Sequence, residues 1–180
     1  MRKLIGSAVL AAVLLTTPAL AVAQRRRPAA RPAPARSERP SFGVELDVGT
    51  DTDFGLGARA VFGLQSLFPK TPLDGQVGFI YFFPSAPTGV DAKYWEINGN
   101  VAYRIPTRVR SSLKPYVGGG LNIAHASATA GGTTASDTKA GLNLLGGTTF
   151  KVKGQVLPFL EARGIIGGGK QVIFAGGVRF

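Results

Sequence analysis

His125 and Ser127 are the residues of this 180-residue sequence whose types and spacing most suggest covalent catalysis. A serine hydroxyl becomes an effective nucleophile when a neighbouring base takes its proton. Two residues apart on a strand, the side chains share a face about 7 Å apart along the backbone. The base is normally oriented by a third group, and Asp137 is the nearest acid in the sequence. Because nothing in the sequence places that acid beside the histidine, we expect no catalytic residues and a protein that is not an enzyme.

Acids and arginines also occur at alternate positions between apolar residues. These charges are Glu45, Asp47, Arg59, Glu96, Arg104, Glu161, Arg163 and Arg179. Glu161 and Arg163 resemble an acid/base pair, but charges taken out of water have to be paired, and a guanidinium group holds a carboxylate well. We therefore predict a structural charge network. Arg179 is the first choice as partner of Glu161, because Arg163 lies on the same strand as Glu161.

Metal and cofactor chemistry has no support in the sequence. The chain has no cysteine and one histidine, which excludes the usual structural metal clusters. Residues 118–120 and 167–169 are glycine-rich, but neither run sits between a strand and a helix, as a phosphate-binding loop requires. We expect no metal site and no cofactor.

The elements that position these residues are strands, since apolar residues recur at every second position from Ser41 onward. Most of the predicted strands approach the length that a tilted strand needs to cross a membrane. The pattern predicts an all-β fold, an eight-stranded antiparallel up-and-down transmembrane β-barrel with its charges in the lumen. The predicted strands cover residues 42–48, 54–65, 76–83, 94–105, 114–126, 138–152, 156–164 and 171–180.

A soluble β-sandwich also alternates, but the aromatic residues favour a barrel. They gather at strand ends, as the two membrane interfaces demand. One predicted rim holds Phe42, Phe62, Tyr103, Phe150 and Phe180, and the other holds Phe54, Tyr81, Phe83 and Trp95. Because eight strands enclose an interior just wide enough for side chains, we expect the charges to plug the lumen.

The first 40 residues have a different composition from the barrel. Residues 1–23 are predicted to be a cleaved signal peptide, with a basic start, a short apolar stretch and a small-residue cleavage site. Residues 24–40 are rich in arginine, proline and alanine and predict a disordered linker. These two segments carry most of the formal net charge of +11, so we expect no nucleic-acid partner. The linker is interpreted as a solvated segment or as a tether to an anionic periplasmic surface.

Three segments resemble the small outer-membrane barrel family that includes the OmpA membrane domain, OmpX and OmpW. They are Pro115–Asn122, Pro158–Arg163 and Phe174–Phe180. In that family the final strand ends in phenylalanine and is read by the barrel-assembly machinery during insertion. The resemblance thus implies a membrane-insertion signal at Phe174, Val178 and Phe180, although Ala175 stands where glycine is usual. It also implies a place in the bacterial outer membrane, in contact with outer-membrane lipid.

The His-x-Ser pair is similar to that of a family of barrel enzymes that remove acyl chains from lipid A. The arginine and asparagine that flank the pair in that family are Ala124 and Ala128 in this chain. The resemblance implies a lipid A-modifying enzyme that uses His125 and Ser127, and this stays the second alternative.

The expected function is therefore a structural or surface-interaction role, through membrane integrity, adhesion or partner binding. The outer loops that would carry it are residues 84–93, 127–137 and 165–170. A narrow conduit for small solutes is the first alternative. An even number of strands places both termini on the same side, which we predict to be the periplasm.

Overall fold

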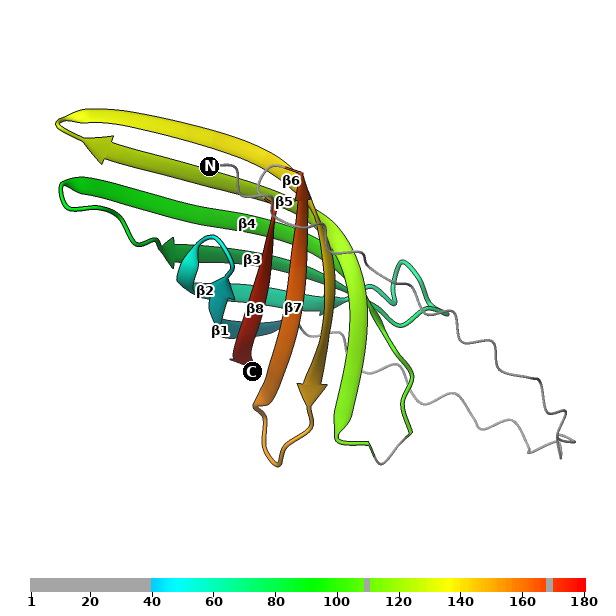
Figure 1. Ribbon diagram of the computed structural model, residues 1–180. Coiled ribbons are helices and arrows are strands. Elements are labelled where there is room, and N and C mark those ends of the chain that lie inside the picture. Colours follow the sequence, from blue (N-terminus) through cyan, green and yellow to red (C-terminus); the bar gives the residue numbers. More distant parts are fainter. Residues whose placement is uncertain (1–39, 109–110, 168–169) are drawn as a thin grey trace, which may run out of the picture. The chain divides into compact units, whose positions relative to one another are not determined.

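Within the described residues, 40–108, 111–167 and 170–180, the computed structural model is one closed antiparallel barrel of eight strands (Figure 1). Every strand pairs with its neighbours in the chain, and β1 pairs with β8 to close the sheet. This confirms the predicted fold class. The strands are β1 (Ser41–Gly49), β2 (Asp53–Gly63), β3 (Leu73–Phe83), β4 (Val90–Arg104), β5 (Leu113–Ala130), β6 (Thr133–Phe150), β7 (Leu157–Gly167) and β8 (Gln171–Arg179).

The predicted signal peptide, and the predicted linker up to residue 39, lie outside the described residues. The described residues contain no helix that is long and apolar enough to cross a membrane.

Alternation along each strand decides which side chains enter the barrel. In β1, Val44 and Leu46 point outward and are each 53% exposed, whereas Glu45 and Asp47 point inward and are buried. The outward positions of the other strands carry leucine, valine, isoleucine and aromatic side chains in the same way. An apolar exterior around a polar interior is the arrangement that a barrel in lipid requires.

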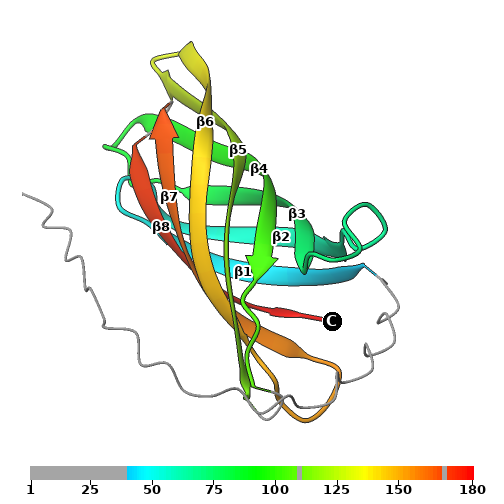
Figure 2. The ribbon, with the colours of Figure 1, turned by 90° about the vertical axis from the view of Figure 1, so that its right-hand side faces the viewer.

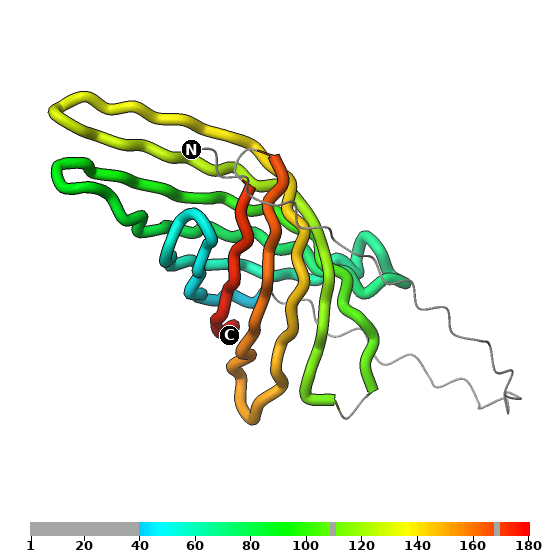
Figure 3. Tube along the Cα trace, viewed as in Figure 1, coloured from blue at the N-terminus to red at the C-terminus, as the bar shows by residue number. Residues whose placement is uncertain are grey.

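The up-and-down order divides the connections between the strands among the two ends of the barrel (Figure 3). We call the end with Ser41, Phe180 and the β2–β3, β4–β5 and β6–β7 connections the terminal end. The other end, with the β1–β2, β3–β4, β5–β6 and β7–β8 connections, is called the hairpin end.

The β5–β6 hairpin is longer than the sequence pattern suggested. Residues 127–137 were expected to form a loop, but they continue both strands, which pair up to Ala130 and Thr133. The turn is reduced to Gly131 and Gly132, whose φ angles of +56° and +81° suit glycine in a two-residue hairpin turn. The expectation was wrong because small Ser, Thr and Ala residues can alternate in a strand without an apolar face to reveal it.

The other expected outer loops are also shorter. The β3–β4 connection covers residues 84–89 instead of 84–93, and β7 extends to Gly167 instead of ending at residue 164. Pairing of β3 with β4 stops at Tyr94, and pairing of β6 with β7 starts at Gly141. Residues 90–93, 126–130 and 133–140 therefore project beyond their neighbours as a three-stranded extension, which we call the projecting sheet (Figure 2).

Aromatic rings collect on the outer surface at the hairpin end. Phe54 stacks on Phe83 at 6.0 Å between ring centroids, and Trp95 stacks on His125 at 5.1 Å. Tyr81 contacts Phe83 edge to face at 5.2 Å. Such a belt is typical of a membrane–water interface, and it matches the second rim predicted from the sequence.

The barrel interior is partly apolar, which the sequence pattern did not predict. Ile80, Phe82, Ile165 and Ile173 form one buried cluster, with Tyr94 packed against it. Ala102, Tyr116 and Leu145 form another. A narrow eight-stranded barrel is filled by side chains, so large apolar groups fit wherever no charged partner needs the space.

The last residue closes the sheet, and this generates a prediction. The Phe180 N–H donates to Phe42 O at 2.8 Å, the Phe42 N–H donates to Phe180 O at 3.0 Å, and Phe180 as a whole is 64% exposed. Deleting Phe180 should reduce the heat-modifiable, membrane-inserted protein several-fold without reducing export. Phe83→Ala, which removes an outward ring at the opposite rim, is the control and should insert normally. Normal levels of inserted protein after the deletion would contradict a terminal insertion signal.

Candidate functional site

The centre of the lumen is occupied by a cluster of ion pairs around Glu161. Arg59 donates from Nη1 to Glu161 Oε2 at 3.0 Å and from Nη2 to Oε1 at 3.1 Å. Arg163 Nη2 donates to Glu161 Oε1 at 2.8 Å, and the Tyr116 hydroxyl donates to Oε2 at 2.8 Å. Arg59 also forms an ion pair with Glu45. All of these side chains are buried, so the pairing offsets the cost of removing their charges from water, while Arg163 Nε and Nη1 have no hydrogen-bond partner among the described residues.

Four strands contribute to this cluster, which we call the lumen charge cluster. Glu45 comes from β1, Arg59 from β2, Tyr116 from β5, and Glu161 and Arg163 from β7. Alternation brings each of them inward, and closure of the barrel brings β2 and β7 within reach across the lumen. The Arg59 guanidinium also lies 4.3 Å from the centroid of the Phe159 ring, an additional attraction for the cation.

The partners of Glu161 differ from those expected. Arg179 was the first choice and Arg163 was thought unsuitable, yet Glu161 is held by Arg59 and Arg163. Arg163 points inward two residues further along β7, and its long side chain reaches the neighbouring carboxylate. Arg59 is 102 residues away in sequence, so only the closed barrel reveals the contact.

Arg104 and Arg179 lie outside the lumen charge cluster, which corrects the predicted network. Arg104 is the last residue of β4, its side chain is 46% exposed, and its Nε lies 3.3 Å from Asp74 Oδ2. Arg179 is the last residue of β8 and is half-buried. Both residues have lumen parity, but they stand at the terminal end, where the barrel opens to solvent.

Asp47 is buried as deeply as any residue of the barrel, yet it is not part of the cluster's hydrogen bonding. It is 0% exposed, and its two carboxylate oxygens have no hydrogen-bond partner among the described residues. The predicted network placed Asp47 in the lumen, and the structure shows it there without a direct ion pair.

A second layer of the lumen is made of amide side chains. Asn143 Nδ2 donates to Asn98 Oδ1 at 2.8 Å and to Asn100 Oδ1 at 2.9 Å. Asn122 Nδ2 donates to Asn98 Oδ1 at 3.0 Å and to Glu96 Oε2 at 3.0 Å. These contacts join β4, β5 and β6 across the interior.

Glu96 belongs to this amide layer instead of to an ion pair. Its carboxylate accepts hydrogen bonds from Asn122, from the Tyr94 hydroxyl at 2.8 Å and from Gln171 Nε2 at 2.8 Å. The sequence had grouped Glu96 with the arginines, which was wrong because polar neutral groups can also satisfy a buried carboxylate. Sequence reasoning did not single out Tyr116, Asn143 and Gln171; their inward parity is the signal that could have found them.

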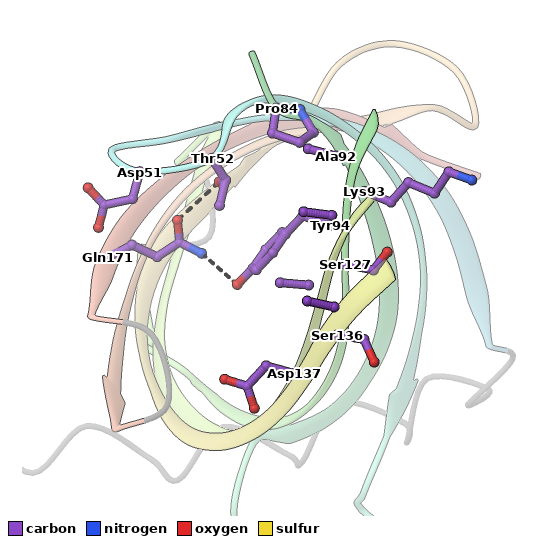
Figure 4. A pocket seen from close by; sticks show the side chains of 13 residues that line it. Asp51, Thr52, Pro84, Ala92, Lys93, Tyr94, Ser127, Ser136, Asp137 and Gln171 are labelled. Carbon is purple, nitrogen blue, oxygen red and sulfur yellow. Dashed lines mark hydrogen bonds between the residues drawn. The ribbon is translucent and has the colours of Figure 1, made fainter. Parts of the chain in front are cut away.

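A cavity of about 510 Å³ opens above the amide layer at the hairpin end (Figure 4). Its floor is closed by a chain of hydrogen bonds, from Thr52 Oγ1 to Gln171 Oε1 at 3.0 Å and from Gln171 Nε2 to the Tyr94 hydroxyl at 3.2 Å. Asp51, Lys93 and Asp137 line its sides. The cavity is therefore open at the hairpin end and bounded below by the side chains of Thr52, Gln171 and Tyr94.

His125 and Ser127 lie on the outer surface of β5, away from the lumen. The His125 ring hydrogen-bonds through Nδ1 to Thr138 Oγ1 at 2.8 Å and stacks on Trp95. Ser127 is paired across the hairpin with Ser136. Asp137, expected in a loop, lies in β6 with inward parity and binds Lys139 at 3.0 Å. The nearest acid in sequence therefore does not orient His125.

No group of three or more potential metal-ligating side chains occurs among the residues that the structure describes.

An apolar exterior, an interior that holds buried charges and amides, and an aromatic belt are typical of a transmembrane β-barrel of the outer membrane. A family model described as "Outer membrane protein beta-barrel domain" matches residues 7–158, and the chain belongs to this family. The comparison with curated proteins finds no match.

Three solved structures share the fold. Neisserial surface protein A is 21% identical with a TM-score of 0.57, over 78% of this chain and 94% of that chain. The N-terminal barrel of Pseudomonas aeruginosa OprF is 13% identical with a TM-score of 0.60, over 78% and 96% of the two chains. Ail, the attachment invasion locus protein of Yersinia pestis, is 12% identical with a TM-score of 0.52, over 78% and 93%.

The lumen charge cluster makes a prediction about stability. Glu161→Ala leaves Arg59 and Arg163 buried without their shared carboxylate, and should lower the free energy of unfolding by about 3–5 kcal/mol. Replacing Glu45, Arg59, Glu161 and Arg163 together by leucine or methionine should cost much less, because no charge of the lumen charge cluster is left without its partner. Urea unfolding in lipid vesicles measures both effects.

Glu96→Gln is the control and should cost little. The neutral partners of Glu96, which are Tyr94, Asn122 and Gln171, can also form hydrogen bonds with an amide. Equal losses in the single variant and in the variant with all four replacements would contradict the pairing described above.

Proposed function

We propose that this protein is a plugged outer-membrane barrel that displays the projecting sheet outside the cell as a contact surface. The observation that carries the proposal is the filled lumen, in which the lumen charge cluster and the amide layer follow one another along the barrel. A solute would have to separate the buried ion pairs of Glu161 with Arg59 and Arg163 to pass, which is costly. This argues against the narrow conduit that the sequence left open.

The projecting sheet supports a role in surface contact. Its outward positions carry short polar side chains, including Ser127, Thr129, Thr134 and Ser136. The Thr129 and Thr134 hydroxyls hydrogen-bond across the hairpin at 2.9 Å. From Thr133 to Ala140, β6 has no strand partner on its β7 side among the described residues. An open strand edge with polar side chains can bind an extended segment of another protein.

The proposal includes an orientation. With the terminal end in the periplasm, residues 1–23 would be removed on export and the barrel-assembly machinery would read Phe174, Val178 and Phe180. Outer-membrane lipid would then surround the apolar exterior. One structural neighbour is named an attachment invasion locus protein and another a surface protein, and we propose a role of this kind for the projecting sheet.

The proposal does not include catalysis. His125 and Ser127 share a face of β5, but the histidine is held by Thr138 and its ring is covered by Trp95. Without an orienting acid or an oxyanion donor, the serine gains no activation. We propose that the pair contributes interfacial polarity on the outer leaflet side.

A shortened hairpin tests the contact surface. Deleting residues 127–130 and 133–136 keeps the Gly131–Gly132 turn and preserves the inward parity of Ala126 and Asp137. The extension loses four residues from each strand, about 14 Å of strand length. Cells that carry this variant should insert normal amounts of heat-modifiable barrel but adhere several-fold less to epithelial monolayers than cells with the full protein.

Thr129→Ala/Thr134→Ala is the control that keeps the length of the hairpin, and it should retain most of the adherence. Unchanged adherence of the shortened variant would contradict a contact role for the projecting sheet.

A further inference from the structure

The connections at the terminal end carry a concentration of positive charge. The exposed cations there are Lys70, Arg104, Arg108, Lys114, Lys151 and Lys153, and half-buried Arg179 stands beside them. Among the described residues of this end, Asp74 is the one acid, and it is occupied by Arg104 at 3.3 Å. The described residues of the β2–β3, β4–β5 and β6–β7 connections contain no aspartate or glutamate that could pair with the lysines of this end.

The hairpin end has no such excess. Its exposed acids are Asp51, Asp53, Asp91 and Asp137, and its lysines are Lys93, Lys139 and Lys170. Two of these lysines are already paired, Lys93 with Asp91 at 3.4 Å and Lys139 with Asp137 at 3.0 Å. The excess of positive over negative charge on the described barrel surface therefore lies at the terminal end.

Exposed apolar side chains lie among these cations. Leu67 is 70% exposed and Phe68 49% exposed, three and two residues before Lys70. The Leu67 and Phe68 N–H groups both donate to Leu64 O, at 3.1 and 2.8 Å, so a compact turn presents the two side chains. Val152 lies between Lys151 and Lys153 and is 44% exposed. Apolar groups alternating with cations form an amphipathic surface.

Several of these cationic residues also lie where the apolar exterior ends at the terminal end of the barrel. Arg104 directly follows outward-facing Tyr103, and Lys151 directly follows Phe150, which pairs with Leu113. Long cationic side chains next to an apolar band place their charge at the level of lipid head groups. The arginine-rich segment 24–40 joins the barrel at this same end, because it directly precedes Ser41.

We propose that the terminal end is a binding surface for anionic phospholipid head groups in the membrane leaflet that faces the periplasm. Lysine and arginine attract the phosphates, and Leu67, Phe68 and Val152 enter the acyl boundary. A cell-wall polymer would use the cations but would leave the apolar side chains in water. The proposal rests on the orientation given under the proposed function.

Charge-matched variants of the full chain test this surface. The terminal-end variant is Lys70→Gln/Lys151→Gln/Lys153→Gln, and the hairpin-end control is Lys93→Gln/Lys139→Gln/Lys170→Gln. Each protein is folded into vesicles of phosphatidylethanolamine with phosphatidylglycerol and extracted mildly. Native mass spectrometry then measures the lipid that each protein retains.

The wild-type protein and the control should retain phosphatidylglycerol over phosphatidylethanolamine several-fold, and the terminal-end variant should lose most of that preference. High salt should weaken the preference of the wild-type protein. Equal preference in both variants, or none in the wild-type protein, would overturn the proposal.

A second variant separates lipid from polymer. Leu67→Ser/Phe68→Ser leaves the charge unchanged and should still reduce the retained phosphatidylglycerol. If it retains as much as the wild-type protein while isolated cell-wall sacculi bind the wild-type protein and not the terminal-end variant, the surface binds polymer and the proposal fails.

Orientation is tested independently with single cysteines, since the natural chain has none. On intact cells, an impermeant maleimide should label Thr88→Cys and spare Lys153→Cys. The reverse labelling would refute the orientation in the proposed function, and with it the assignment to the periplasmic leaflet. Correct labelling together with an absent lipid preference would refute the lipid surface alone.

Discussion

A narrow lumen that must hold charges without water is the constraint on which this structure depends. Glu161 is satisfied there by Arg59 from β2, Arg163 from its own strand and Tyr116 from β5. Because these contacts span the interior, they fix the position of opposite walls relative to each other, beyond what the hydrogen bonds between neighbouring strands can do. Removing one charged partner from such a cluster leaves the other charge buried and unpaired. This lowers stability far more than building the same interior from apolar residues would.

The fold follows from sequence alternation more directly than the site does. The alternation indicates that Val44 and Leu46 face outward and that Glu45 and Arg59 face inward. The number of strands, their antiparallel order and the lumen location of Glu161 could therefore be predicted. The partner of Glu161 could not, since Arg59 becomes its neighbour only when β8 closes onto β1. Likewise, residues 127–137 lack an apolar face, and only the Gly131–Gly132 turn marks them as a hairpin.

The two ends of the barrel divide the chemistry of the molecule. The hairpin end has an aromatic belt, balanced charge and a polar sheet that projects past the barrel. The terminal end has exposed cations with Leu67 and Phe68 among them. Under the proposed function, the filled interior leaves no passage between these ends, and each end acts on what lies on its own side of the membrane. The proposed role at the surface agrees with this separation.

The central claim, that the lumen is closed by paired side chains, is tested most directly by conductance in planar bilayers. The wild-type barrel should insert without steady current steps. The variant Arg59→Ala/Glu161→Ala/Arg163→Ala, which removes three of the four charges of the lumen charge cluster, should conduct measurably more and would show that the assay detects an opened lumen. Steady, large steps from the wild-type barrel, insensitive to these substitutions, would contradict the account.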